Sequence, residues 1–159
     1  MTTTNVIFTL VSPAVAVLVA LFGFRRSTRA DKIRAFFEMY ERYLTAETRA
    51  GRRALHQHIR GKSAESLTQV ASSSLSSAGY ALAVMNAIAI ACEGKYVDTR
   101  LIALSMGRSY VSAVKAASTY IDWLESVRGF RPYPYAERLA DELVRRHGVT
   151  SSDSESMSD

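Results

Sequence analysis

Residues 6–24 form an apolar run, VIFTLVSPAVAVLVALFGF, that contains no charged side chain and is followed directly by Arg25 and Arg26. A helix of this length spans about 28 Å, which is close to the hydrocarbon thickness of a lipid bilayer. Pro13 is tolerated in a membrane-spanning helix and would kink it. We therefore predict a transmembrane helix over residues 6–24, preceded by a short extracytoplasmic segment, residues 1–5.

Two other interpretations of this run are a cleaved signal peptide and a buried helix of a soluble protein. A signal peptide normally begins with basic residues and ends at a small-residue cleavage site. Here residues 1–5 (MTTTN) have no basic side chain, and the run ends in Phe22, Gly23 and Phe24. A buried helix without any polar face would be unusual in so small a domain. The pattern favours the membrane anchor.

The charges beside the run predict its orientation. Residues 25–62 have a net charge of +7, because eleven basic side chains stand against four acidic ones. Positive charge is retained in the cytoplasm, so we expect the N-terminus outside the inner (plasma) membrane and residues 25–148 inside the cell. The basic side chains nearest the run are candidate contacts to anionic lipid headgroups: Arg25, Arg26 and Arg29.

The remainder of the chain has the composition of a helical domain. The whole chain of 159 residues includes only three prolines and eight glycines, the residues that helices tolerate least. We predict an all-α fold with three parts: the N-terminal transmembrane helix, a cytoplasmic antiparallel bundle of about four to five helices over residues 25–148, and a disordered, acidic, serine-rich tail over residues 149–159. The single cysteine, Cys92, lies in an apolar run, which is typical of a buried core residue.

Apolar side chains at three- and four-residue spacings predict an amphipathic helix over residues 28–44. Its apolar face either packs on the domain itself or lies on the bilayer, and the acidic residues of its polar face favour the first. The residues of this face are Ile33, Phe36, Phe37, Tyr40, Tyr43 and Leu44.

Thr45 is a candidate N-cap for a second helix that runs to about Arg60. This helix carries a basic patch, which is either a solvated face or a contact for phosphate or lipid headgroups. His56 and His58 are two residues apart, so a helix points them to different sides and we expect no metal site there. The patch consists of Arg49, Arg52, Arg53 and Arg60.

Residues 66–92 contain no charged side chain. Their later part, residues 78–92 (AGYALAVMNAIAIAC), is apolar nearly all round, which is typical of a buried central helix or of a second membrane span. Gln69, Asn86 and the serines of residues 72–77 dilute its hydrophobicity and favour the buried helix. In that case Asn86 needs a hydrogen-bond partner inside the bundle.

Asp98 is a candidate cap for a long helix that reaches Arg128. The connection FRPYPY precedes a last helix that begins near Pro134 and ends near His147. Three aromatic side chains in this region are candidate contacts for a protein partner: Trp123, Tyr133 and Tyr135. A row at three- and four-residue spacing is predicted to pack against neighbouring helices: Leu101, Leu104, Gly107, Val111, Val114, Ser118, Ile121 and Leu124.

The order of these features resembles a known family. An N-terminal span precedes FFEMYERYLTAETRAGRRAL, which is followed by a core helix with VMNAIAIACEGKYVD and by a closing PYPYAERLADELV. Over about residues 5–146 the chain is similar to the bacterial membrane proteins grouped as domain of unknown function 4760. The resemblance implies a membrane location and a helical fold. It implies no activity and no site residues.

The sequence contains no paired carboxylates, Ser-His-Asp set, metal-ligand cluster or glycine-rich phosphate loop. We therefore expect a membrane-anchored, non-enzymatic helical module that binds a protein partner or a second copy of itself, with no cofactor. Nucleic acid is not an expected partner, because no recognised binding motif accompanies the basic patch. The alternative is a membrane-associated enzyme or ligand sensor that acts on lipid headgroups or a phosphorylated small molecule. Its anion would be held by Arg49, Arg52 and Arg53, in a pocket lined by Tyr80 or Tyr110.

Overall fold

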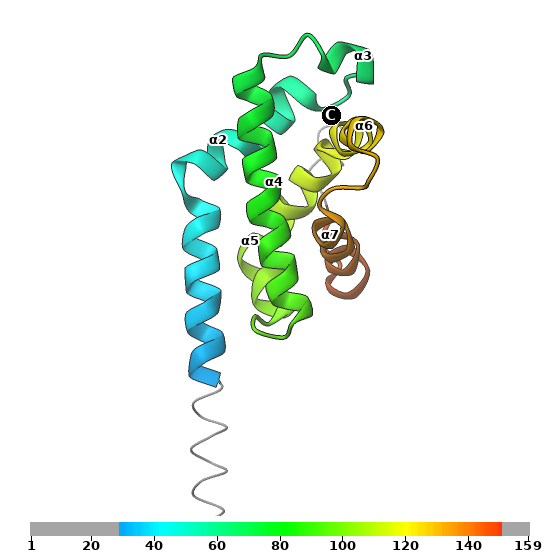
Figure 1. Ribbon diagram of the computed structural model, residues 1–159. Helices are drawn as coiled ribbons and strands as arrows, with labels where there is room; N and C mark the ends of the chain where they lie inside the picture. The colour runs from blue at the N-terminus through cyan, green and yellow to red at the C-terminus, as the bar shows by residue number, and fades with distance from the viewer. Residues whose placement is uncertain (1–28, 151–159) are drawn as a thin grey trace, which may run out of the picture.

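The structure, a computed structural model, describes residues 29–150 (Figure 1). These residues are built from helices and contain no strand, so the predicted all-α fold is confirmed for the described part of the chain. The predicted span over residues 6–24, the adjoining Arg25 and Arg26, and residues 151–159 of the predicted tail lie outside the described residues.

Residues 29–44 are helical throughout, as the spacing of their apolar side chains predicts. Phe36 and Tyr43, two turns apart, are buried in the core. The domain therefore covers one side of this helix, and the other apolar side chains remain outside that contact. Three of them are exposed: Ile33, Phe37 and Leu44.

Thr45 separates this helix from the next one, α2 (Ala46–Ala54). Its side-chain oxygen accepts a hydrogen bond from Thr48 N at 3.3 Å, so the predicted N-cap is confirmed. α2 continues directly into η1 (Leu55–Ile59), a single π-helical turn that nothing in the sequence predicts. Turns of this kind occur often at functional sites, because the extra residue changes the direction of neighbouring side chains.

α3 (Ala64–Leu67) is a short helix, and α4 (Ser72–Glu93) is the central one (Figure 1). α4 packs against α2 and against α7 (Pro134–His147), and its residues Leu82, Met85 and Ile88 are fully buried. Among the described helices, α4 alone is long and apolar enough to cross a membrane, with a mean hydropathy of 1.6 and 33% of its most apolar window buried. A core helix meets the same criterion, so this property does not place α4 in a bilayer.

The structure divides the predicted helix over residues 98–128 into α5 (Thr99–Ala116) and α6 (Ser118–Arg128). The prediction of one continuous helix is wrong. The N–H of Ala117 is shared by two carbonyl oxygens at 3.1 Å each, those of Ala113 and Val114. This sharing tightens the last turn of α5 and lets α6 turn toward α3, which it contacts.

The row of contact residues predicted along residues 101–124 is correct in most positions, since Gly107, Val111, Val114, Ile121 and Leu124 are buried, but it is narrower than the buried surface of α5 and wrong at Leu104 and Ser118. Leu104 belongs to that row but is 79% exposed, whereas Met106, Tyr110 and Ala113 are buried. α5 contacts η1, α4, α6 and α7. Because several of its sides are covered at once, a single row of apolar residues does not identify the buried surface.

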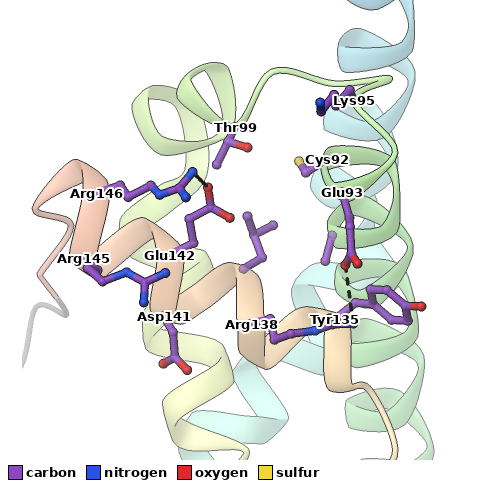
Figure 2. Close-up of a pocket in the computed structure, with 12 residues that line it drawn as sticks. Cys92, Glu93, Lys95, Thr99, Tyr135, Arg138, Asp141, Glu142, Arg145 and Arg146 are labelled. Carbon is purple, nitrogen blue, oxygen red and sulfur yellow. Dashed lines mark hydrogen bonds and ion pairs between the residues drawn. The ribbon is translucent and has the colours of Figure 1, made fainter.

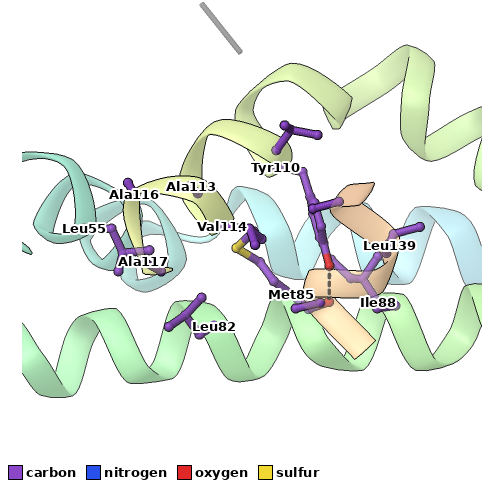
Figure 3. Packing of buried hydrophobic residues seen from close by; sticks show 14 of the residues in the cluster. Leu55, Leu82, Met85, Ile88, Tyr110, Ala113, Val114, Ala116, Ala117 and Leu139 are labelled. Atoms are coloured by element: carbon purple, nitrogen blue, oxygen red, sulfur yellow. Dashed lines mark hydrogen bonds between the residues drawn. The ribbon is translucent and has the colours of Figure 1, made fainter. Parts of the chain in front are cut away.

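The core lies where α4, α5, α7 and η1 meet (Figure 3). Leu55 of η1, Val114 of α5 and Leu139 of α7 point into it beside Met85 of α4. The hydroxyl of Tyr110 donates a hydrogen bond to the Met85 carbonyl oxygen at 3.0 Å. Burial raises the pKa of Tyr110 well above its ordinary value, so this donor stays neutral. Tyr110 is therefore a core residue with a satisfied hydroxyl.

The N-terminus of α7 is closed by a side chain from α4. Asn86 Oδ1 accepts hydrogen bonds from Tyr135 N and Ala136 N, both at 3.1 Å. Both amides lie in the first turn of α7, where the helix leaves N–H groups without an acceptor of its own; Ala136 N also donates to the Tyr133 carbonyl oxygen at 3.1 Å. α7 begins at Pro134, as predicted. Asn86 thus has the hydrogen-bond partner that a polar residue in the central helix was predicted to need.

Candidate functional site

Basic side chains gather in a hollow of about 400 Å³ where α2 and η1 meet α5. The residues that line it are Arg49, Arg52, Arg53, His56 and Ser109. The four from α2 and η1 are spaced as i, i+3, i+4 and i+7, which puts them on one face of the helix. The opposite face packs on α4 through Gly51 and Ala54. The fold therefore brings three arginines of the predicted basic patch to one hollow, and the fourth, Arg60, does not line it.

Arg52 is held by two other helices. Its guanidinium lies over the Tyr43 ring, with Cζ 3.9 Å from the ring centroid. Nη1 donates to Ser109 Oγ at 3.2 Å, and Nη2 donates to the Tyr43 carbonyl oxygen at 3.4 Å. Ser109 in turn donates to the Met106 carbonyl oxygen at 3.2 Å, so its own oxygen accepts from Arg52 and from the Tyr43 hydroxyl, which lies 2.8 Å away. The guanidinium plane is thus oriented by the protein.

One donor of this oriented group lacks an acceptor. Within the described chain, Arg52 Nε is buried and has no hydrogen-bond partner. A buried N–H without an acceptor costs about 1–3 kcal/mol. Buried polar groups are otherwise almost always paired, so this unused donor sets Arg52 apart from the other arginines of the hollow.

The positive charge of the hollow is not neutralised by acidic side chains of its lining. No carboxylate lines it among the described residues. Burial raises the pKa of Tyr43, and the positive charge of Arg52 opposes that shift only in part. The Tyr43 hydroxyl therefore stays neutral and adds no negative charge beside the arginines. The hollow is suited to an anion.

Comparison with models of protein families finds one family that matches the chain. Residues 10–143 match the family described as Domain of unknown function (DUF4760), as the resemblance predicted. The chain belongs to this family. The match includes α2, η1 and α5, and hence every residue that lines the basic hollow of this DUF4760 protein. Among curated proteins and among solved structures, no match to the chain is found.

A second hollow of the DUF4760 protein, about 520 Å³ in volume, lies between the end of α4 and α7 (Figure 2). Four of its charged side chains form two ion pairs. Arg138 Nη2 lies 3.4 Å from Glu93 Oε2, and Arg146 Nη1 lies 2.8 Å from Glu142 Oε1. Arg138 also lies over the Tyr135 ring, with Cζ 4.4 Å from the centroid. Because these acids and bases neutralise one another, this hollow attracts an anion less than the basic hollow does.

Cys92 lines this second hollow and is buried, as its apolar surroundings predict. Burial, and to a smaller degree the charge of Glu142, raises the pKa of its thiol to about 12. At about pH 8 the reactive thiolate is then roughly one part in ten thousand. We expect iodoacetamide to modify Cys92 of the folded chain at least about 100-fold more slowly than in urea, measured by mass spectrometry. Equal rates in the two conditions would contradict the burial of this thiol.

The three candidate partner contacts take part in packing within the domain. The Tyr133 hydroxyl donates to a carbonyl oxygen of α4 at 3.3 Å, and Tyr135 stacks with Arg138. The Trp123 ring stacks on Tyr120, with centroids 5.9 Å apart. All three remain half-buried. Contact of their exposed edges with a protein partner stays a prediction.

The candidate lipid contacts are only partly described. Arg29 is exposed on the helix over residues 29–44, and Arg25 and Arg26 lie outside the described residues. Tyr80, a candidate for lining a ligand pocket, is exposed on α4 and is absent from the lining of the basic hollow. Within the described chain, no group of three or more His, Cys, Asp or Glu side chains is placed to hold a metal ion.

Sequence reasoning missed two residues of the site, Tyr43 and Ser109. They come from other helices, nine and 57 positions from Arg52, and only the packing of α5 beside α2 and η1 brings them together. His56 was considered only as a metal ligand. Its spacing from Arg49, Arg52 and Arg53 was the signal that would have placed it on the basic face.

Proposed function

We propose that this DUF4760 protein is a membrane-anchored helical binding module whose basic hollow holds a phosphate-bearing anion. The observation that carries the proposal is the state of Arg52. Its guanidinium is oriented by Tyr43 and Ser109, yet one buried N–H lacks an acceptor. A lipid headgroup and a soluble phosphorylated molecule offer the same chemistry to this site.

Guanidinium groups suit phosphate because their planar, fork-shaped donors match two of its oxygens at once. Arg49 and Arg53 are exposed, so their side chains can turn toward a ligand that Arg52 has already oriented. Three like charges in one hollow also raise one another's energy, and a bound anion relieves that repulsion. Both effects favour an anion with several oxygens over a single carboxylate.

The proposal assigns binding to this site and no catalysis. A guanidinium remains protonated at every physiological pH, so the arginines hold and orient an anion and transfer no proton. The ligand-sensor alternative from the sequence is thereby favoured over the protein-interaction role. That role, which includes association with a second copy of the chain, stays a prediction.

The location is part of the proposal and rests on the sequence. A single span over residues 6–24 in the inner (plasma) membrane, with the N-terminus outside, leaves the helical domain in the cytoplasm. Arg25 and Arg26 would then lie at the level of the anionic headgroups. In this arrangement the basic hollow has access to both lipid headgroups and cytoplasmic phosphate compounds.

Replacing Arg49 and Arg53 by glutamine is expected to weaken the binding of inorganic phosphate by at least about tenfold. Each charge-assisted hydrogen bond contributes about 1.5–3 kcal/mol, and the double variant removes two arginines that can make them. Both side chains are exposed, so the variant should fold. The measurement is isothermal titration calorimetry of the full chain in detergent micelles with inorganic phosphate.

The matched control is Arg100→Gln with Arg128→Gln, which removes the same charge from two exposed positions outside the hollow. It should bind phosphate nearly as the unchanged protein does. Dihexanoyl phosphatidic acid, with dihexanoyl phosphatidylcholine as its control, separates the two sources of the ligand. Tighter binding of phosphatidic acid than of inorganic phosphate would identify a lipid, and equal affinity would identify the phosphate group alone. Equal weakening by the two double variants would contradict the site.

A further inference from the structure

Two further hollows share lining residues with the basic hollow. The first, which we call the serine hollow, has a volume of about 380 Å³ and lies where α2 and η1 meet the start of α4. The other, the α5 hollow, has a volume of about 500 Å³ and lies between α5 and the C-terminal end of α7. Arg53 lines both the basic hollow and the serine hollow, and Ser109 lines both the basic hollow and the α5 hollow. The three hollows therefore form one connected surface.

This connected surface is positively charged. Among the described residues, no Asp or Glu side chain lines any of its three hollows, whereas three such side chains line the hollow between α4 and α7. Four arginines line the surface: Arg49, Arg52, Arg53 and Arg108. Each hollow also contains one of the three histidines of the chain: His56, His58 and His147. The surface is therefore suited to an anion along its whole extent.

The two outer hollows add hydrogen-bond donors of their own. In the α5 hollow, Arg108 and His147 are both exposed and come from different helices. The serine hollow combines His58 with three hydroxyl groups, those of Ser73, Ser74 and Ser77. All three hollows have volumes within the range of about 300–1,000 Å³ that holds drug-sized ligands. A single phosphate group fills none of them, so the surface has room and donors for a longer anion.

We propose that the ligand of the basic hollow is a linear polyphosphate, an anion with several phosphate groups in series that continues into the serine hollow and the α5 hollow. The inference rests on the proposed function of the basic hollow and names the class of its ligand. Arg53 and Ser109, which line two hollows each, are placed to contact the chain where it passes from one hollow to the next. Linked groups that reach separate subsites bind about 100-fold to 10,000-fold more tightly than one group alone.

A nucleic acid strand also carries phosphate groups in series, but this surface does not suit its bases. Proteins that bind single strands stack the bases on aromatic side chains. Among the described residues, no Phe, Tyr or Trp lines any of the three hollows. The Tyr43 ring beside the basic hollow is covered on one face by the Arg52 guanidinium. The surface therefore favours a polyanion without bases.

The test is isothermal titration calorimetry of the full chain in detergent micelles, with inorganic phosphate and with a long-chain linear polyphosphate. The polyphosphate should bind at least about 100-fold more tightly than inorganic phosphate. Arg108→Gln combined with His147→Gln should weaken polyphosphate binding at least about tenfold, because it removes the charged donors of the α5 hollow. The same variant should bind inorganic phosphate as the unchanged chain does, since both residues lie outside the basic hollow. Both side chains are exposed, so the variant should fold.

The matched control is Arg100→Gln with Arg128→Gln, which changes two exposed basic residues that line none of the three hollows. It should weaken polyphosphate binding less than about twofold, since exposed charges away from a site contribute little. A single-stranded oligouridylate presents phosphate groups in series together with bases. It should bind the unchanged chain more weakly than the polyphosphate does, because the lining offers no aromatic side chain for stacking.

The outcomes separate this inference from the proposed function. If inorganic phosphate binds and the polyphosphate binds no more tightly, the inference is overturned while the proposed function stands. The same holds if the α5-hollow variant and its control weaken polyphosphate binding equally, because general attraction to positive charge then explains the affinity. Tighter binding of the oligouridylate would identify a nucleic acid ligand instead. If neither inorganic phosphate nor polyphosphate binds, the proposed function fails and the inference fails with it.

Discussion

Replacing Gly51 by alanine is expected to lower the free energy of unfolding by about 3 kcal/mol and to weaken phosphate binding. Gly51 lies where α2 crosses α4. A Cβ atom at this position would overlap the Ser77 carbonyl oxygen and lie 2.6 Å from Ala81 Cβ. Backbone and Cβ atoms cannot turn aside as a long side chain can, so the two helices must separate. Arg52 is carried by the same helix and moves with it. Thermal unfolding of the full chain in micelles, followed by circular dichroism, measures the loss.

The matched control for this prediction is Gly79→Ala on the partner helix. A Cβ atom there would lie 3.4 Å from Tyr120 Oη and 3.7 Å from Tyr133 Oη, which are ordinary contact distances. Alanine also restricts the unfolded chain and favours the helix by about 0.5–1 kcal/mol. This variant should therefore unfold at the same temperature or slightly higher. If the two variants lose stability equally, the close crossing at Gly51 is not the cause.

The parts of the fold that the sequence predicts are those with local physical signals. Thr45 offers a side-chain oxygen at the start of α2, and Asp98 does the same for α5, where its Oδ1 accepts from Arg100 N at 2.9 Å. Pro134 is compatible with the first turn of α7 and is found there. Each of these residues acts on its own helix within a few positions, so one stretch of sequence is enough to recognise it.

Other features depend on packing between distant segments. Nothing in the residues around Ala117 marks a break, because alanine favours helices and no proline or glycine is present. The break accompanies the contact of α6 with α3, which lies far from it in the sequence. Leu104 was placed on the wrong face for a related reason, since α5 is covered on several sides and its apolar residues follow no single row.

The candidate site was predictable in part. The density of arginine over residues 49–53 predicts a basic face. Whether that face is only solvated or contacts an anion depends on which side chains from other helices lie beside it. Tyr43 and Ser109 bear on that choice, because both orient the Arg52 guanidinium and Ser109 also lines the hollow beside it. The membrane span over residues 6–24 stays a prediction, because it lies outside the described residues.

Replacing Asn86 by leucine is expected to lower the free energy of unfolding by about 2 kcal/mol, although leucine is apolar and a good helix former. Oδ1 of Asn86 is the acceptor for the first-turn amides of Tyr135 and Ala136, both at 3.1 Å. Without it, Tyr135 N loses its partner, and Ala136 N keeps only its bond to the Tyr133 carbonyl oxygen. α7 also supplies Leu139 and Leu143 to the core, so loosening its first turn weakens that packing. Urea unfolding followed by the fluorescence of the single tryptophan, Trp123, reports the change.

Asn86→Asp separates the loss of the acceptor from a general intolerance of this position. Aspartate has nearly the same shape, keeps an oxygen where Oδ1 accepts the two hydrogen bonds, and adds a negative charge at the N-terminus of a helix, where such a charge is stabilising. Its unfolding midpoint should stay close to that of the unchanged protein, well above that of Asn86→Leu. If aspartate destabilises as much as leucine does, the amide group rather than the acceptor oxygen is required, and the capping role of Asn86 is wrong. If leucine is harmless, the first turn of α7 is held by its side-chain contacts alone.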